Sequence, residues 1–255
     1  MLEQRLRAVR DAGGKAFVPY VTGGLPGVDV GLLRGLQDAG ADAIEVGIPH
    51  SDPIMDGGVI QEASRISLDR GTQPADVLAV VAEAALSIPV AAMTYVNPVV
   101  RRGFELFVGD LAAAGVSGVI VPDLPVDEAG VFESLATARG VDTVLLAAPG
   151  TSGERLSRIG RSAHGFVYCV ATYGVTGARE ELSATAREVV DALRPHTDLP
   201  LLVGVGIGSA AQAEAVCAFA DGVIVGSAIV ARLMDDGPGA ALALASAFRG
   251  AIASG

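Results

Sequence analysis

The stretch AGADAIEVG (39–47) runs from the end of a helix, through a glycine corner, into a short apolar strand. The same order of features returns in AGVSGVIVPD (114–123), RGVDTVLLA (139–147) and FADGVIVG (219–226). In the first three copies, a glycine stands where helices commonly end in the left-handed conformation. This partial repeat predicts strands that alternate with helices along the chain.

Eight short apolar runs have this strand character. They lie at 16–22, 42–48, 90–96, 118–124, 142–148, 165–171, 200–206 and 222–228. Valine and isoleucine occupy both faces of most runs, which is typical of a parallel sheet covered on both sides. Eight strand–helix units predict a single-domain (β/α)8 TIM barrel over residues 1–255, preceded by a short amphipathic N-terminal helix. A doubly wound open sheet is the alternative fold.

Composition and charge exclude several classes of protein. The net charge of −11 argues against nucleic-acid binding, which needs clustered basic residues. Cys169 and Cys217 have no CxxC spacing, so we expect neither a disulfide framework nor a zinc site. Glu83 and Pro89 interrupt the longest apolar stretch (77–93), and the N-terminus lacks the apolar core of a signal peptide. We therefore expect a cytoplasmic protein with no membrane span and no metal.

Glu45 is unusual because it lies inside an apolar strand. Side chains alternate along a strand, so Glu45 should point into the barrel near the carboxyl end, where this fold builds active sites. Burial raises the pKa of a carboxyl group, which suits acid–base catalysis. The alternative is a structural glutamate paired with a buried arginine, but no predicted strand contains arginine or lysine. Asp56 follows in the loop from the same strand and should face the same mouth, although an aspartate before Gly-Gly is otherwise ordinary turn chemistry.

Glycine-rich loops follow the last three predicted strands. GVGIGS (204–209) and VGSAIV (225–230) stand where barrels of this kind often bind phosphate with backbone N–H groups. The long loop TYGVTGARE (172–180) contributes Gly177 and is interpreted as a mobile lid. Ordinary corners and an exposed loop are the alternatives.

The remaining candidates are aromatic or titratable. Tyr168 alternates with Phe166, so we expect its ring to point inward near Glu45, with simple core filling as the alternative. The three histidines His50, His164 and His196 lack metal-ligand spacing and are interpreted as structural or solvated.

Taken together, these motifs resemble the tryptophan synthase alpha subunit family along essentially the whole chain. The segment IEVGIPHSDPIMDG is the most specific of them. The resemblance rests on residues 17–27, 44–57, 93–99, 121–125, 173–179, 204–207 and 222–230.

The resemblance implies a (β/α)8 barrel that cleaves indole-3-glycerol phosphate to indole and glyceraldehyde 3-phosphate by a retro-aldol reaction. It implies that Glu45 is the acid–base residue and that Asp56 is a second catalytic acid at the indole N–H. It also places Tyr168 in the active site, near the glutamate. Matches to substrate-binding positions are Gly177, Gly206, Gly226 and Ser227 at the phosphate, Tyr20 and Tyr95 near the indole pocket, and Thr176 on the lid.

The family's alpha subunit associates with a β subunit in an α2β2 complex, and indole passes through a tunnel to the β subunit. The β subunit carries pyridoxal phosphate, so the resemblance implies no metal and no cofactor in this chain. The loop with Asp52 and Pro53 matches a region of that contact. Departures from the family pattern occur in the same loop: His50 replaces phenylalanine or tyrosine, and Gly58 replaces proline. Ile54-Met55 and Thr172-Tyr173 also depart from the commoner residues.

Three competing functions remain open on the residues alone. A phosphoribosyl or triose phosphate isomerase could use the same glycine loops, but it would place its acids on other strands. An inactive regulatory subunit need not retain Glu45, Asp56 and Tyr168. A stand-alone lyase that releases free indole would have the same residues.

Overall fold

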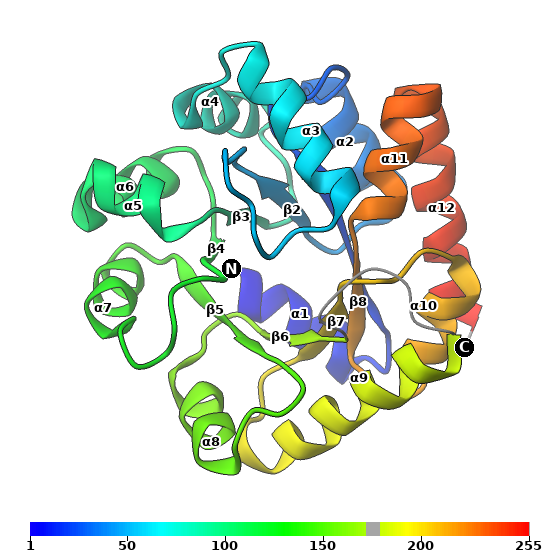
Figure 1. Ribbon diagram of the computed structural model, residues 1–255. Helices are drawn as coiled ribbons and strands as arrows, with labels where there is room; N and C mark the ends of the chain where they lie inside the picture. Colours follow the sequence, from blue (N-terminus) through cyan, green and yellow to red (C-terminus); the bar gives the residue numbers. More distant parts are fainter. Residues whose placement is uncertain (172–178, 255) are drawn as a thin grey trace.

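The computed structural model describes residues 1–171 and 179–254, so Thr176, Gly177 and most of the proposed lid lie outside the described residues. Eight parallel strands close a barrel in sequence order, and β1 pairs with both β2 and β8. Helices surround the barrel in the same order (Figure 1). The predicted (β/α)8 barrel is confirmed, and the open sheet is excluded by the pairing of the first and last strands.

Each of the eight apolar runs contains one strand. The strands are β1 (Ala16–Thr22), β2 (Ile44–Gly47), β3 (Val90–Met93), β4 (Gly118–Ile120), β5 (Asp142–Ala147), β6 (Val167–Val170), β7 (Leu201–Gly204) and β8 (Gly222–Val225). Most are shorter than the apolar run that contains them, because the chain leaves the sheet toward the mouth of the barrel. In β4, for example, pairing ends two residues before Pro122, which has no N–H to donate.

The described chain forms twelve α-helices and one short 3-10 helix. They are α1 (Leu2–Asp11), α2 (Val30–Asp38), α3 (Gly58–Asp69), α4 (Pro74–Ala84), α5 (Val96–Arg102), α6 (Phe104–Ala113), α7 (Gly130–Ala138), α8 (Gly153–Ser162), α9 (Arg179–Leu193), η1 (Arg194–His196), α10 (Ala210–Cys217), α11 (Ser227–Asp236) and α12 (Pro238–Ser254). The glycines in the repeated corners have positive φ, with values of 93° at Gly40, 78° at Gly115 and 70° at Gly140. The repeat therefore ends its helices as the sequence predicts.

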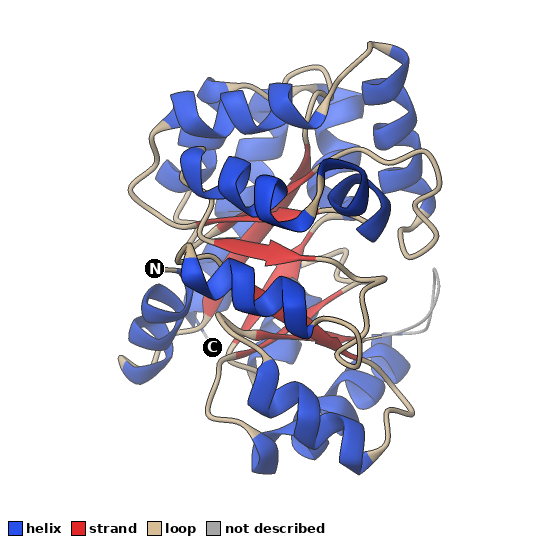
Figure 2. Ribbon diagram, turned by 90° about the vertical axis from the view of Figure 1, so that its left-hand side faces the viewer, coloured by secondary structure: helices blue, strands red, loops and turns tan. Residues whose placement is uncertain are grey.

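Helix α1 covers the amino-terminal ends of the strands. Leu2 and Leu6 are fully buried, and a Cβ added to Gly118 at the start of β4 would lie 2.3 Å from Leu2 Cδ2. The backbone N–H of Glu3 donates to the carboxylate of Asp142, the first residue of β5, at 3.0 Å. The N- and C-termini lie on the same side of the molecule (Figure 2). The N-terminal helix thus closes one end of the barrel and leaves the carboxyl ends of the strands for the site.

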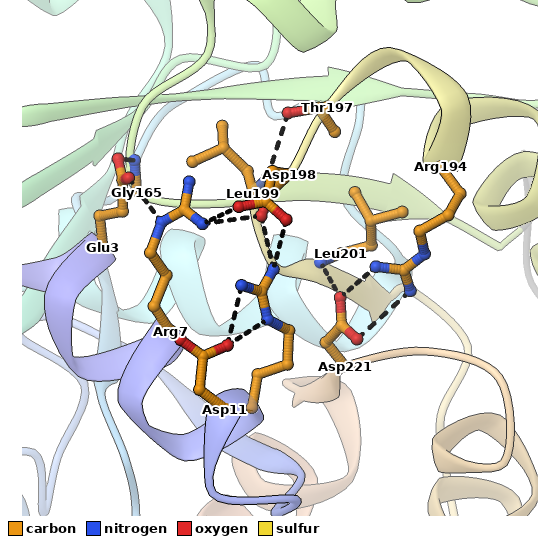
Figure 3. Close-up of polar contacts among 11 residues, drawn as sticks. Glu3, Arg7, Asp11, Gly165, Arg194, Thr197, Asp198, Leu199, Leu201 and Asp221 are labelled. Carbon is orange, nitrogen blue, oxygen red and sulfur yellow. Dashed lines mark hydrogen bonds and ion pairs between the residues drawn. The ribbon is translucent and has the colours of Figure 1, made fainter.

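Ion pairs tie this closed end together, and they differ in burial (Figure 3). Arg7 bridges Glu3 at 2.7 Å and Asp198 at 2.6 Å, but the Asp198 side chain is 85% exposed. Asp221 binds Arg194 and accepts the Leu201 N–H at 2.8 Å. These contacts lie far from the mouth and have a structural role.

Asp42 is the most buried anion of this end, with its side chain 4% exposed. It accepts from Arg5 at 2.8 Å, from Arg249 at 3.1 Å and from the Phe17 N–H at 3.0 Å. We expect Asp42→Ala to lower the free energy of unfolding by about 3 kcal/mol, since it leaves two arginines and one buried N–H without their acceptor. Urea unfolding measures the change, with Asp198→Ala as the exposed control. An equal loss of unfolding free energy in Asp42→Ala and Asp198→Ala would contradict the expectation that the more buried aspartate contributes more.

Candidate active site

Glu45 lies in the middle of β2 and is 3% exposed. Its register partners are Tyr20 on β1 and Ala91 on β3. Glu45 Oε2 is buried and has no hydrogen-bond partner among the described residues, and none of the ion pairs between described residues includes Glu45. The arginine partner of the structural alternative is therefore missing from the part of the chain that the structure describes. A buried carboxyl oxygen without a partner is costly, which is typical of groups kept for chemistry.

Asp56 lies in the β2–α3 loop and is held by a tyrosine from another strand–helix unit. The Tyr95 hydroxyl donates to Asp56 Oδ2 at 3.1 Å and accepts the Met55 N–H at 3.0 Å. Tyr95 is buried at the start of α5, after β3. The predicted indole-pocket tyrosine and the predicted second acid are thus in direct contact.

The two acids are electrostatically coupled and differ in pKa. Burial, followed by the charge of Asp56, raises the pKa of Glu45 to about 8. Burial also raises the pKa of Asp56, to about 6, against the Tyr95 hydrogen bond and the charge of His50, which both lower it. Around neutral pH the protonated form of Glu45 and the ionised form of Asp56 coexist. Pairs of carboxyl groups whose pKa values are pushed apart supply an acid and an anion to the same reaction.

Two tyrosines fill the barrel beside Glu45, each placed over a strand glycine. A Cβ added to Gly47 would lie 2.0 Å from the Tyr20 hydroxyl oxygen, and one added to Gly204 would lie 2.2 Å from that of Tyr168. Burial raises the pKa of Tyr168, and the nearby charge of Glu45 raises it further. The inward orientation expected for Tyr168 is confirmed, and both phenols stay protonated. Glycine inside a strand often marks such a close approach.

The β7–α10 and β8–α11 connections carry the remaining candidate phosphate ligands. Gly206 has a φ of 90°. Gly226 takes the N-cap position of α11, where no side chain of the described structure caps the helix, and Ser227 is the first helical residue. A Cβ added to Gly226 would lie 3.4 Å from Tyr20 Cδ1, so this helix start adjoins the site. Backbone N–H groups at such a helix start favour an anion.

Val205 is a feature of the same region that the sequence did not reveal. It has a φ of 68°, which is strained for a β-branched residue, and its side chain is partly exposed at the mouth. Strain of this kind persists only where the surroundings impose it and gathers at functional sites. The strained residue lies between Gly204, which accommodates Tyr168, and Gly206.

A cavity of about 500 Å³ lies at the carboxyl ends of β4, β5 and β6. Its lining combines apolar side chains, among them Met55 from the β2–α3 loop, Leu146 and Val170, with the polar residues Ser152 and Arg155. Met55 and its neighbour Ile54 are both exposed. The mouth therefore combines acids, phenols and an open hollow of mixed polarity.

Several residues of this site escaped sequence reasoning. His50, interpreted as structural or solvated, stacks on Tyr95 with ring centroids 4.8 Å apart. The strand glycines Gly47 and Gly204 were detectable as glycines inside strands, but nothing in the sequence indicated which tyrosine lies over each. Gly206, Gly226, Ser227, Tyr20, Tyr95 and Tyr168 lie at the same end of the barrel, as expected.

No group of three or more His, Cys, Asp and Glu side chains in the described residues is arranged to hold a metal ion. None of the helices described is both long and apolar enough to cross a membrane.

Comparisons with known proteins agree with this geometry. The family model of the tryptophan synthase alpha chain matches residues 6–248. The alpha chain of Streptomyces avermitilis is 43% identical, over 100% of this chain and 94% of its own length. That of Streptomyces coelicolor is 44% identical, over 92% of this chain and 88% of its own length. The solved structure of tryptophan synthase from Mycobacterium tuberculosis superposes with a TM-score of 0.91 at 38% identity, covering 100% of this chain and 98% of that one. The chain belongs to the tryptophan synthase alpha chain family.

Proposed function

We propose that this chain cleaves indole-3-glycerol phosphate to indole and glyceraldehyde 3-phosphate, with Glu45 as the acid–base residue and Asp56 as a fixed anion. It is a carbon–carbon lyase of tryptophan biosynthesis. The observation that supports these roles best is the pairing of a buried, unpartnered Glu45 carboxyl oxygen with an Asp56 carboxylate held by Tyr95, both at one mouth. Neither of the two alternative functions, isomerase or inactive regulatory subunit, requires Glu45 and Asp56 at these positions.

The reaction consists of two proton transfers and the cleavage of one carbon–carbon bond. The Glu45 carboxyl donates a proton to C3 of the indole ring, which leaves a positive charge delocalised onto the ring nitrogen. The same carboxylate then takes the proton of the side-chain hydroxyl. The bond between C3 and the hydroxyl-bearing carbon breaks, its electron pair restores the aromatic ring, and the hydroxyl oxygen becomes the aldehyde of glyceraldehyde 3-phosphate. Protons and electrons balance, so the step needs no cofactor in this chain.

Asp56 supplies a negative charge beside the positively charged intermediate. A carboxylate beside the ring nitrogen stabilises the iminium-like state, and it does so more strongly where water is excluded. Tyr95 holds that carboxylate by the 3.1 Å hydrogen bond. Tyr20 and Tyr95 lie near the indole pocket, and Tyr20 and Tyr168, both beside Glu45, limit water access to the acid.

The phosphate of the substrate binds at the glycine loops. Gly206, Gly226 and Ser227 supply backbone N–H groups there. The resemblance also assigns Gly177 to the phosphate and Thr176 to the second acid; both lie outside the residues that the structure describes. Because α11 begins beside the Tyr20 ring, the phosphate end and the indole end of one substrate can be bound together.

The partner is a tryptophan synthase β subunit in an α2β2 complex. Ile54 is 78% exposed and Met55 41% exposed, and Met55 lines the cavity at the carboxyl ends of β4, β5 and β6. Exposed apolar residues around a hollow are typical of a protein contact and not of a solvated loop. Pyridoxal phosphate belongs to that partner.

As part of this proposal, residues 1–255 form one catalytic domain, which acts in the cytoplasm. Helices α1 and α12, at opposite ends of the chain, both pack against β1. Cys169 and Cys217 are both free and buried, as is usual in a reducing compartment.

The test is indole release from indole-3-glycerol phosphate by the purified chain, with and without a β subunit. We expect slow release by the chain alone and strong stimulation by the partner. Fast release alone would identify an independent lyase. Absence of release in both conditions would overturn the proposed reaction and favour the inactive regulatory subunit.

The same assay should show a bell-shaped dependence of kcat/KM on pH. Below about pH 6 the Asp56 carboxylate becomes protonated, and the stabilising anion is lost. Above about pH 8 the Glu45 carboxyl loses the proton that C3 requires. We therefore expect a maximum near pH 7, with the two limbs reporting the coupled pair. A profile that is flat from pH 5 to pH 9 would contradict the assignment.

A further inference from the structure

His50 lies in the β2–α3 loop between Glu45 and Asp56 in sequence and packs against the residue that holds Asp56. Its imidazole ring stacks on the Tyr95 ring at 4.8 Å, with 27° between the planes. His50 Nδ1 accepts the backbone N–H of Asp52 at 3.1 Å, so the neutral ring carries its proton on Nε2. Both contacts fix the imidazole in one orientation.

A short chain of contacts leads from this ring to the candidate anion. Tyr95 donates to Asp56 Oδ2 at 3.1 Å while it accepts the Met55 N–H at 3.0 Å. His50 therefore packs against the face of the Tyr95 ring, and the β2–α3 loop binds its hydroxyl through Met55 and Asp56. Any rotation of the Tyr95 ring would move the hydroxyl that orients Asp56.

We propose that His50 is a positioning residue for Asp56: its ring holds Tyr95 in place, and with it the hydroxyl that donates to the Asp56 carboxylate. A hydrogen bond to a carboxylate favours its ionised form, so the position of Tyr95 affects the anion that the reaction requires. The inference rests on the proposed function only for its catalytic consequence.

Other charged or titratable groups face the same residues and set the background. Asp52, whose carboxylate accepts from Ser51 at 2.7 Å, is nearest to His50 on its own loop. Asp123 acts on Tyr95 from the β4–α7 connection, and Glu45 feels the Asp56 charge from β2. Burial raises the pKa of Asp56, and the Tyr95 hydrogen bond is the largest influence that lowers it.

The test compares His50→Phe with His50→Leu by ¹³C NMR of selectively labelled aspartate, with the Asp56 signal assigned by its loss in Asp56→Asn. His50→Phe keeps an aromatic ring over Tyr95, so we expect the Asp56 titration midpoint and kcat to stay near the wild-type values. His50→Leu removes the stack, so we expect the Asp56 midpoint to rise by roughly half a pH unit as the Tyr95 hydrogen bond loosens, and kcat to fall roughly tenfold with a smaller change in KM. His196→Phe, the same substitution in η1 on the closed side, should leave the midpoint unchanged.

An Asp56 midpoint that stays unchanged in His50→Leu would overturn the proposal. The midpoint does not depend on turnover, so it can be measured even if the wild-type chain releases no indole. In that case the proposed function fails while the coupling of His50 to Asp56 stands or falls separately. If His50→Leu does not fold, His50→Gln, which also lacks the ring, decides the outcome in its place.

Discussion

Glu45→Gln should reduce indole release by roughly 10³-fold or more, because one carboxyl group serves as acid and then as base. Glutamine has nearly the same shape but cannot give or take the proton. The pKa of Glu45 is raised to about 8, so the native side chain is already neutral at pH 7, and a neutral amide should fit the site. We therefore expect an unchanged circular dichroism spectrum and no large loss of stability. The measurement is single-turnover indole release at pH 7.

Glu133→Gln is a matched control for this prediction. Glu133 Oε1 is also buried and lacks a hydrogen-bond partner among the described residues, and burial raises the pKa of its carboxyl group. It lies on α7, outside the barrel. The control should retain wild-type turnover. Wild-type turnover in Glu45→Gln itself would remove Glu45 from the mechanism.

Asp56→Asn should lower kcat by about 10²- to 10³-fold, the usual cost of removing one preorganised charge-stabilising group. The Tyr95 hydroxyl can still donate to the asparagine oxygen, so the loop keeps its geometry and the loss reports charge. Two changes in the pH profile should accompany it. The limb near pH 6 disappears, and the alkaline limb moves to lower pH because the Asp56 charge no longer raises the pKa of Glu45.

Asp69→Asn is the control for simple loss of charge, since Asp69 is an exposed residue at the end of α3 that pairs with Arg65. It should leave kcat and both limbs unchanged. An alkaline limb that stays in place in Asp56→Asn would show that the two acids are not coupled, and a wild-type kcat would exclude Asp56 as the stabilising anion.

Much of the barrel follows from local patterns. Apolar runs predict all eight strands, and the corner glycines end their helices with the expected positive φ. The inward direction of Glu45 needs only the alternation of side chains along a strand. Asp56 faces the same mouth because it follows that strand by a few residues. Strand ends were less well predicted, because apolar residues continue into the loops that line the mouth.

The contacts that shape the site depend on tertiary structure. Tyr95 and Asp56 are 39 residues apart, and no periodicity indicates their hydrogen bond. The Tyr20 hydroxyl lies over Gly47 because β1 and β2 pair in one register, and Tyr168 lies over Gly204 for the same reason on β6 and β7.

By itself, therefore, the sequence determined the alternation of eight strands with helices, the inward acid and the family pattern, because these depend on neighbours along the chain. The tertiary structure decided which phenol orients Asp56, that His50 stacks on that phenol, and how far the pKa values of the two acids separate. Those properties depend on the burial and distance of groups brought together by strand register and packing, which the local order of residues does not encode.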